Sequence, residues 1–130
     1  MQLYKHLSRK NDNILIEGIG GLLVPITFNK LFLDFIKILN LPVFLVTTNK
    51  LGTINHTLLS IHILKENNIK FKIIFNKLDI KKSDRENKAV LKDITRFGKI
   101  DNIIQIPFIR PEKLRYSKFC CKVSPAIFNF

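Results

Sequence analysis

The chain has 130 residues, which fits one domain with a hydrophobic core of its own. Hydrophobic residues make up 46% of it and charged residues 25%, a balance that excludes an intrinsically disordered chain. The formal charge is +12, but the lysines are scattered instead of gathered in one block, so we expect no nucleic-acid partner and a surface that attracts anionic ligands.

The sequence also indicates the cellular compartment in which the protein works. Asn, Lys and Asp interrupt every apolar run before it reaches the roughly 18 residues of a membrane span, so we expect no membrane partner. Residues 1–13 are polar and lack the long apolar centre of a secretory signal. Cys120 and Cys121 are adjacent and have no His cluster nearby, which favours neither a disulfide nor a zinc site. We therefore expect a cytoplasmic protein.

Short apolar runs alternate with longer amphipathic stretches along the chain. The runs are short enough to be strands buried on both faces, and they cover residues 13–16, 42–47, 71–75 and 102–106. The amphipathic stretches predict helices over residues 30–39, 53–66 and 83–96. This order predicts an α/β fold with a parallel sheet and flanking helices joined by right-handed crossovers. Residues 111–130 form a tail to which we assign no element.

The expected helices differ in how much apolar surface they offer. In the first, we expect Leu31, Phe35, Ile38 and Leu39 on one side. In the second, the residues expected toward the interior are Leu58, Leu59, Ile61, His62 and Leu64. The third should begin after Ser83 with a capping box to Glu86, and its sparse apolar residues predict a place on the outside.

In parallel sheets, ligands bind beyond the carboxyl ends of the strands. This rule selects four segments, residues 17–21, 48–52, 76–79 and 107–110. In the first, Glu17 can bind Mg²⁺, and Gly18, Gly20 and Gly21 allow close approach of the backbone to a ligand. The alternative is a tight turn after the strand with a solvated glutamate.

The other segments carry weaker signals from the residues alone. Gly52 permits an unusual turn, Thr53 can cap the following helix, and Asn55 and His56 fall in its first turn, where backbone N–H groups favour an anion. His56 is more often structural or interfacial than a general base at such a position. The side chain of Asn76 suits the edge of a purine, although an Asn that begins a turn is equally common.

Taken together and in this order, the segments resemble the dethiobiotin synthetase family. Its acidic, glycine-rich signature V-E-G-A-G-G reads Ile16-Glu17-Gly18-Ile19-Gly20-Gly21 here and is followed, as in the family, by a few apolar residues and Pro25. A Leu-Pro-Val strand follows at residues 41–46, and then Leu-Gly-Thr-Ile-Asn-His-Thr-Leu-Leu at residues 51–59, the most specific motif. A strand that ends in Phe75-Asn76 and another that ends in Ile106-Pro107 complete the series. The resemblance covers residues 12–110.

The resemblance implies a P-loop NTPase-like fold, present in part, and a homodimer. It implies the use of ATP and Mg²⁺ to carboxylate 7,8-diaminononanoate with CO₂ and to close the ureido ring. By matching position, Glu17 would bind Mg²⁺, and Gly18, Ile19 and Gly20 would contact nucleotide phosphates and substrate. Asn76 would read adenine with Lys77 beside it. The pocket around the base would be lined by Pro107, Phe108 and Ile109. Leu51 and Asn55 would lie at the dimer interface and touch substrate held by the other subunit.

Two departures from the family pattern qualify this expectation. Ile19 replaces the usual Ala in a loop that approaches the ligand. The family's N-terminal half, with the P-loop, the catalytic lysine, the substrate serine and a second acidic metal ligand, has no counterpart in these residues. We therefore expect residues 1–110 to be a truncated domain without a catalytic residue of its own, inactive alone. The alternatives are a non-catalytic dimerisation or binding module, and a relative of the cobyrinate-type amide ligases.

Overall fold

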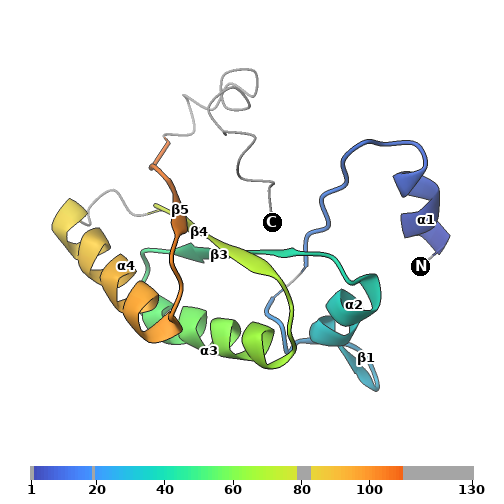
Figure 1. Ribbon diagram of the computed structural model, residues 1–130, viewed down its shortest axis with the longest axis horizontal. Helices are drawn as coiled ribbons and strands as arrows, with labels where there is room; N and C mark the ends of the chain where they lie inside the picture. Colours follow the sequence, from blue (N-terminus) through green and yellow to red (C-terminus); the bar gives the residue numbers. More distant parts are fainter. Residues whose placement is uncertain (1, 19, 79–82, 110–130) are drawn as a thin grey trace. The chain divides into compact units, whose positions relative to one another are not determined.

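The computed structural model describes residues 2–18, 20–78 and 83–109 (Figure 1). Its contacts divide the chain into two compact units, one that ends at Leu39 and one that begins at Asn40. The predictions for Ile19, for the 111–130 tail and for its two cysteines lie outside the described residues. No helix in the described ranges is both long enough and apolar enough to cross a membrane.

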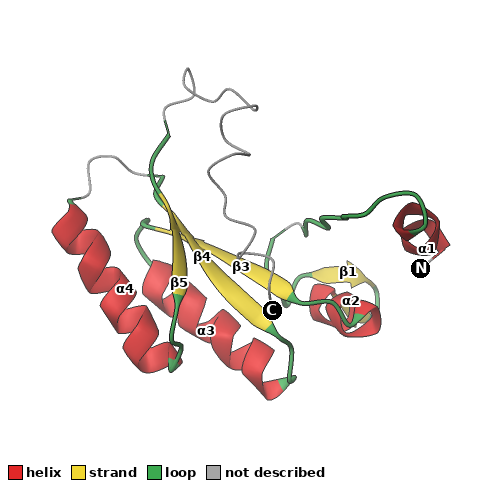
Figure 2. Cartoon of the chain, turned by 45° about the horizontal axis from the view of Figure 1, so that its top comes forward, coloured by secondary structure: helices red, strands yellow, loops and turns green. Residues whose placement is uncertain are grey.

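The second unit contains a parallel sheet of three strands in the order β3-β4-β5 (Figure 2). The strands are β3 (Val43–Thr48), β4 (Phe71–Asn76) and β5 (Ile103–Ile106), connected through α3 (Thr53–Glu66) and α4 (Asp84–Gly98). These elements confirm three of the four predicted strands and two of the three predicted helices within a residue or two at each end. Ser83 and Glu86 form the predicted capping box at the start of α4.

Both helices of this unit cover the same face of the sheet (Figures 1 and 2). The core lies between them, where Ile61 of α3, Ile73 of β4 and Ile94 of α4 are at most 2% exposed. The expected outside position of α4 is therefore wrong. Val90, Ile94 and Gly98 repeat every four residues, and this narrow stripe is enough to seat the helix although few of its residues are apolar.

The predicted interior face of α3 is partly wrong. Ile61 and Leu64 are buried and Leu58 packs against the core, but Leu59 is 54% exposed and His62 is exposed as well. The buried stripe runs instead through Thr53, Thr57, Ile61 and Leu64. Two of its positions are threonines whose hydroxyls are hydrogen-bonded, so a search for apolar residues alone misplaces the face.

The first unit contains α1 (Gln2–Ser8), a two-stranded antiparallel sheet of β1 (Pro25–Thr27) and β2 (Lys30–Leu31), and α2 (Phe32–Leu39). The predicted strand over residues 13–16 is wrong, because these residues are irregular and Leu15 is 84% exposed. An extended run becomes part of a sheet only when a neighbour accepts its backbone hydrogen bonds, and no described strand pairs with this one.

Helix α2 confirms the first predicted helix with a start two residues later, but its buried side differs. It begins at Phe32 because the two preceding residues belong to β2, and the Asp34 carboxylate accepts a hydrogen bond of 2.9 Å from the Leu31 N–H. Ile36 is its buried residue and is not among the four apolar residues expected on one side, of which Ile38 is 55% exposed.

Candidate functional site

The three strands of the parallel sheet end at one edge. In the register of the sheet, Thr48 of β3 lies opposite Asn76 of β4, and Asn76 lies opposite Ile106 of β5. The segments that follow the strands therefore leave the sheet side by side, as Figure 2 shows for the carboxyl ends of β3, β4 and β5. This is the edge at which open parallel sheets bind ligands.

A hydrogen bond links two of these segments directly. The Lys77 N–H donates to the Ile106 carbonyl across 3.0 Å, so the residue after Asn76 is bonded to the residue before Pro107. The structure thus brings Asn76 and Lys77 next to the 107–109 segment. Asn76, Lys77, Phe108 and Ile109 are half-buried, while Pro107 is exposed. An amide and apolar side chains on neighbouring segments at one edge of a sheet are groups that can hold a flat, polar-edged ring.

The side chain of Lys77 points to a different partner. Its Nζ forms an ion pair of 3.1 Å with the Asp84 carboxylate in the first turn of α4. The Asp84 side chain is 82% exposed, so water screens the pair and it adds little to stability. It does give the Lys77 ammonium a preferred direction, toward α4.

The β3–α3 loop is held by buried hydroxyls. Gly52 has φ 85°, the left-handed conformation, which explains the glycine before the helix. The predicted capping by Thr53 is wrong: no side chain caps α3. The Thr53 hydroxyl instead lies 2.7 Å from that of Thr47, which is also 2.6 Å from that of Thr57. Thr53 is turned inward because the end of β3 offers a hydroxyl partner there.

Beyond this anchored loop, α3 presents an exposed stripe. Leu51 is 98% exposed and Leu59 is 54% exposed, and Asn55 between them is exposed too. The three positions are four residues apart, which puts Asn55 and Leu59 on one side of α3, with Leu51 in the loop just before the helix. Exposed leucines at such spacing are a common feature of surfaces that pair with a partner.

Sequence reasoning missed a buried pair of asparagines at the same edge. Asn49, directly after β3, is 0% exposed, and its Nδ2 donates to Oδ1 of Asn87 on α4 across 3.2 Å. Its Oδ1 accepts from the Leu78 N–H across 3.1 Å. The sequence signal that could have found this pair was Asn87, because this polar residue lies on the same side of α4 as the other buried residues of that helix.

The Glu17 loop belongs to the first unit. Gly20 has φ 81°, and a Cβ on Gly18 would collide with the ring of Phe32, so this glycine is explained by packing within the unit. Glu17 is exposed, and no group of three or more His, Cys, Asp or Glu side chains gathers anywhere in the described ranges. One carboxylate still suits Mg²⁺, which takes one or two from protein and completes its shell with phosphate oxygens and water.

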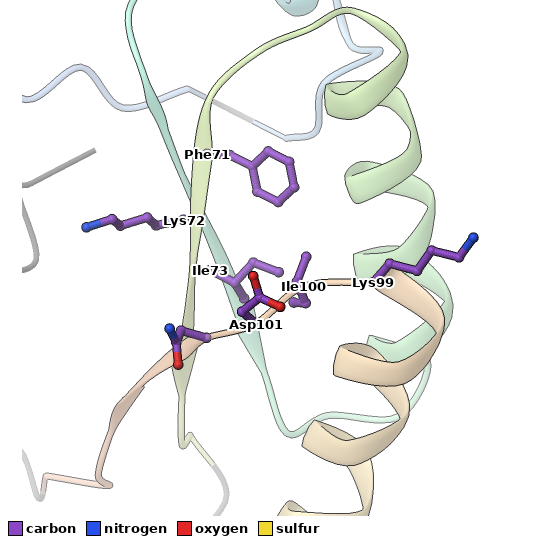
Figure 3. Close-up of a pocket in the computed structure, with 7 residues that line it drawn as sticks. Phe71, Lys72, Ile73, Lys99, Ile100 and Asp101 are labelled. Carbon is purple, nitrogen blue, oxygen red and sulfur yellow. The ribbon is translucent and has the colours of Figure 1, made fainter.

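A cavity of about 270 Å³ lies elsewhere in the second unit (Figure 3). It is at the amino-terminal ends of β4 and β5, the edge of the sheet opposite the three loops. Its lining consists of Phe71, Lys72, Ile73, Lys99, Ile100, Asp101 and Asn102. None of the residues predicted to bind a ligand is among them.

Known proteins resemble this chain over most of its length. It is 44% identical over 113 residues to the ATP-dependent dethiobiotin synthetase BioD of Clostridium perfringens, a match that covers 82% of this chain and 47% of that protein. The corresponding protein of Agrobacterium fabrum is 38% identical over 107 residues, with 82% and 49% covered. A family model described as an AAA domain matches residues 1–112. The chain belongs to the dethiobiotin synthetase family.

Family membership confirms the resemblance found in the motifs, and the fold is the P-loop NTPase-like α/β type that it implied. The chain spans about half the length of the curated relatives it matches. The roles assigned to individual residues stay predictions, and the loops at the carboxyl edge are where the family pattern puts Asn76, Lys77 and residues 107–109.

Proposed function

We propose that this chain supplies the adenine-binding and subunit-pairing part of a cytoplasmic dethiobiotin synthetase. That enzyme would use ATP and Mg²⁺ to carboxylate 7,8-diaminononanoate with CO₂ and to close the ureido ring. The observation that carries the proposal is the hydrogen bond from the Lys77 N–H to the Ile106 carbonyl, because it joins the two segments assigned to the adenine pocket. The ATP dependence in the names of the relatives supports the choice of nucleotide.

The adenine pocket is argued from the chemistry of its walls. The Asn76 side chain has a carbonyl acceptor and an amide donor, which match the amino group and the ring nitrogens of adenine. Phe108 and Ile109 are half-buried and offer apolar surface for the face of the base. Guanine carries an oxygen where adenine carries the amino group, so an Asn76 amide held with its oxygen toward this position would favour ATP over GTP.

The phosphates require more than these residues. Glu17 is an exposed carboxylate that can contribute one oxygen ligand to Mg²⁺ bound to ATP. The 130 residues contain no G-x-x-x-x-G-K-[ST] sequence to cradle the phosphates. We propose that a longer form of this chain or a second chain provides that loop. Without it, the chain should bind the nucleotide but not transfer its phosphate, because phosphoryl transfer depends on clamping the developing charge.

The exposed stripe of Leu51, Asn55 and Leu59 is proposed as the homodimer surface, with Asn55 and Leu51 reaching the substrate held by the partner subunit. Gly20 would contact the substrate that is held by its own subunit. The stripe is exposed in the single chain and combines two leucines with a central amide, which suits a contact that is both apolar and substrate-facing.

Isothermal titration of the full chain with ATP and Mg²⁺ tests the proposal. Asn76→Ala should weaken ATP binding about tenfold, since the loss of one or two hydrogen bonds to the base corresponds to about 1.4 kcal/mol. Asn102→Ala is the matched control, because Asn102 is an exposed asparagine at the opposite edge of the sheet. Equal ATP affinity in all three proteins, or equal affinity for GTP, would contradict the proposed pocket.

A second candidate function is a non-catalytic dimerisation module, favoured by the same exposed stripe. It predicts a stable dimer that does not bind ATP in the presence of Mg²⁺. Sedimentation of the chain with and without ATP, alongside the titration, separates the two. A loss of ATP affinity on Glu17→Ala would count against the module.

A further inference from the structure

We propose that Asn49 and Asn87 form a positioning device that fixes the backbone directly after Asn76. The geometric part of this inference stands alone, and its consequence for adenine recognition rests on the proposed function. Neither residue is among those proposed to contact the nucleotide. They would act through residues 77 and 78, directly after β4.

The geometry joins three parts of the second unit. Asn49 follows β3, Leu78 lies two residues after the end of β4, and Asn87 lies in α4. The Asn49 side chain accepts from the Leu78 N–H at 3.1 Å and donates to Asn87 Oδ1 at 3.2 Å. Asn49 and Asn87 are 0% and 3% exposed, so the bond between the two side chains is shielded from water.

Two consecutive backbone amides are thereby held from opposite sides. The Lys77 N–H donates to the Ile106 carbonyl of β5, whereas the next amide, that of Leu78, donates to the Asn49 side chain next to β3. A peptide fixed at both of these amides cannot rotate without breaking one of the bonds. The residue before them, Asn76, then leaves the sheet in one defined orientation.

This geometry assigns distinct tasks to the two asparagines. Asn49 holds the loop, because its oxygen binds the Leu78 amide. Asn87 holds Asn49, because its oxygen fixes which end of the Asn49 amide faces Leu78. An apolar residue at position 49 would leave the Leu78 N–H without this partner and Asn87 Oδ1 without the Asn49 donor, which explains a polar side chain at a fully buried position.

Hydrogen exchange tests the geometric part without any ligand. Asn49→Ala should accelerate exchange of the Leu78 amide at least tenfold, while the Lys77 amide, bonded to Ile106, changes much less. Asn87→Leu should accelerate Leu78 less than Asn49→Ala does. Asn87→Asp, which keeps an oxygen acceptor for the Asn49 amide, should leave Leu78 near the wild-type rate. Unchanged Leu78 exchange in Asn49→Ala would overturn the proposal.

Nucleotide titration tests the consequence. The ratio of ATP to GTP affinity should fall at least fivefold in Asn49→Ala and in Asn87→Leu, and Asn87→Asp should restore it. Asn102→Ala should leave the ratio unchanged. An unchanged ratio in a folded Asn87→Leu protein whose Leu78 amide exchanges faster would overturn the link to adenine recognition. If the wild-type chain binds neither nucleotide, the proposed function fails, and the exchange rates of Leu78 alone then decide whether the positioning device exists.

Discussion

The Thr47 hydroxyl is the centre of a buried group of three threonines that anchors the β3–α3 loop. It lies 2.7 Å from the Thr53 hydroxyl and 2.6 Å from the Thr57 hydroxyl, and the three residues are at most 8% exposed. One hydroxyl can donate one hydrogen bond and accept two, so Thr47 can serve both neighbours at once. Thr47→Val keeps the shape of the side chain and removes this shared partner.

The size of the effect follows from the two hydroxyls that lose a partner. A buried polar group without a hydrogen bond costs about 1–3 kcal/mol. Thr57 can instead bond to the Thr53 carbonyl one turn earlier, so the lower end applies to it, whereas Thr53 begins α3 and has no preceding turn. We expect Thr47→Val to reduce the free energy of unfolding by about 2–4 kcal/mol. Substituting valine at all three positions removes the buried hydroxyls together and should cost about 1 kcal/mol or less.

Urea unfolding followed by far-ultraviolet circular dichroism measures both values. Thr95→Val is the control, since the Thr95 hydroxyl donates only to the Leu91 carbonyl of its own helix, and it should cost about 0.5 kcal/mol or less. If the triple variant is less stable than Thr47→Val, or if Thr47→Val matches the wild type, the three hydroxyls do not act as a group and the reasoning is refuted.

Four further predictions concern other parts of the chain. Ser83→Ala removes the oxygen that accepts from the Glu86 N–H and should lower the free energy of unfolding by about 1 kcal/mol; an unchanged urea midpoint would contradict it. Gly98→Val should cost about 1–3 kcal/mol, because even a Cβ there would lie 2.9 Å from Ile61 Cδ1; a wild-type thermal midpoint would argue against this packing. Glu17→Ala should abolish the increase in ATP affinity that Mg²⁺ gives to the wild-type chain, and an increase that survives in titrations with and without Mg²⁺ would remove Glu17 as a ligand. Leu59→Lys should shift the chain toward monomer in sedimentation, and a wild-type chain that is monomeric and unfolds in one sharp transition would contradict the expected association.

Much of the second unit could be predicted because its signals are local. The apolar runs that form β3, β4 and β5 are bounded by turn residues. The capping box at Ser83 involves only residues 83–86, so it can be recognised from a short stretch of sequence. The order of these elements was enough to predict a parallel sheet and to select its carboxyl edge. The unusual turn at the glycine before α3, and the meeting of the loops at this edge, were also predicted from residue type and element order.

The features that the sequence did not predict depend on partners that are distant in the sequence. The run at residues 13–16 has the composition of a strand but no described neighbour to pair with. Thr57 lies in the buried stripe of α3 because a hydroxyl from β3 faces it, and Asn49 is buried because Asn87 is 38 residues away in sequence but 3.2 Å away in space. Periodicity sorts residues by polarity, so it cannot recognise polar side chains that satisfy one another inside the core.

Amide NMR of the labelled chain during titration with ATP and Mg²⁺ tests the central claim, that the carboxyl edge of the β3–β5 sheet binds adenine. We expect the largest changes in chemical shift at Asn76, Lys77, Phe108 and Ile109, and small changes at Asn102 on the opposite edge. Changes centred on the cavity beside Asn102, or no changes at saturating ATP, would contradict the account.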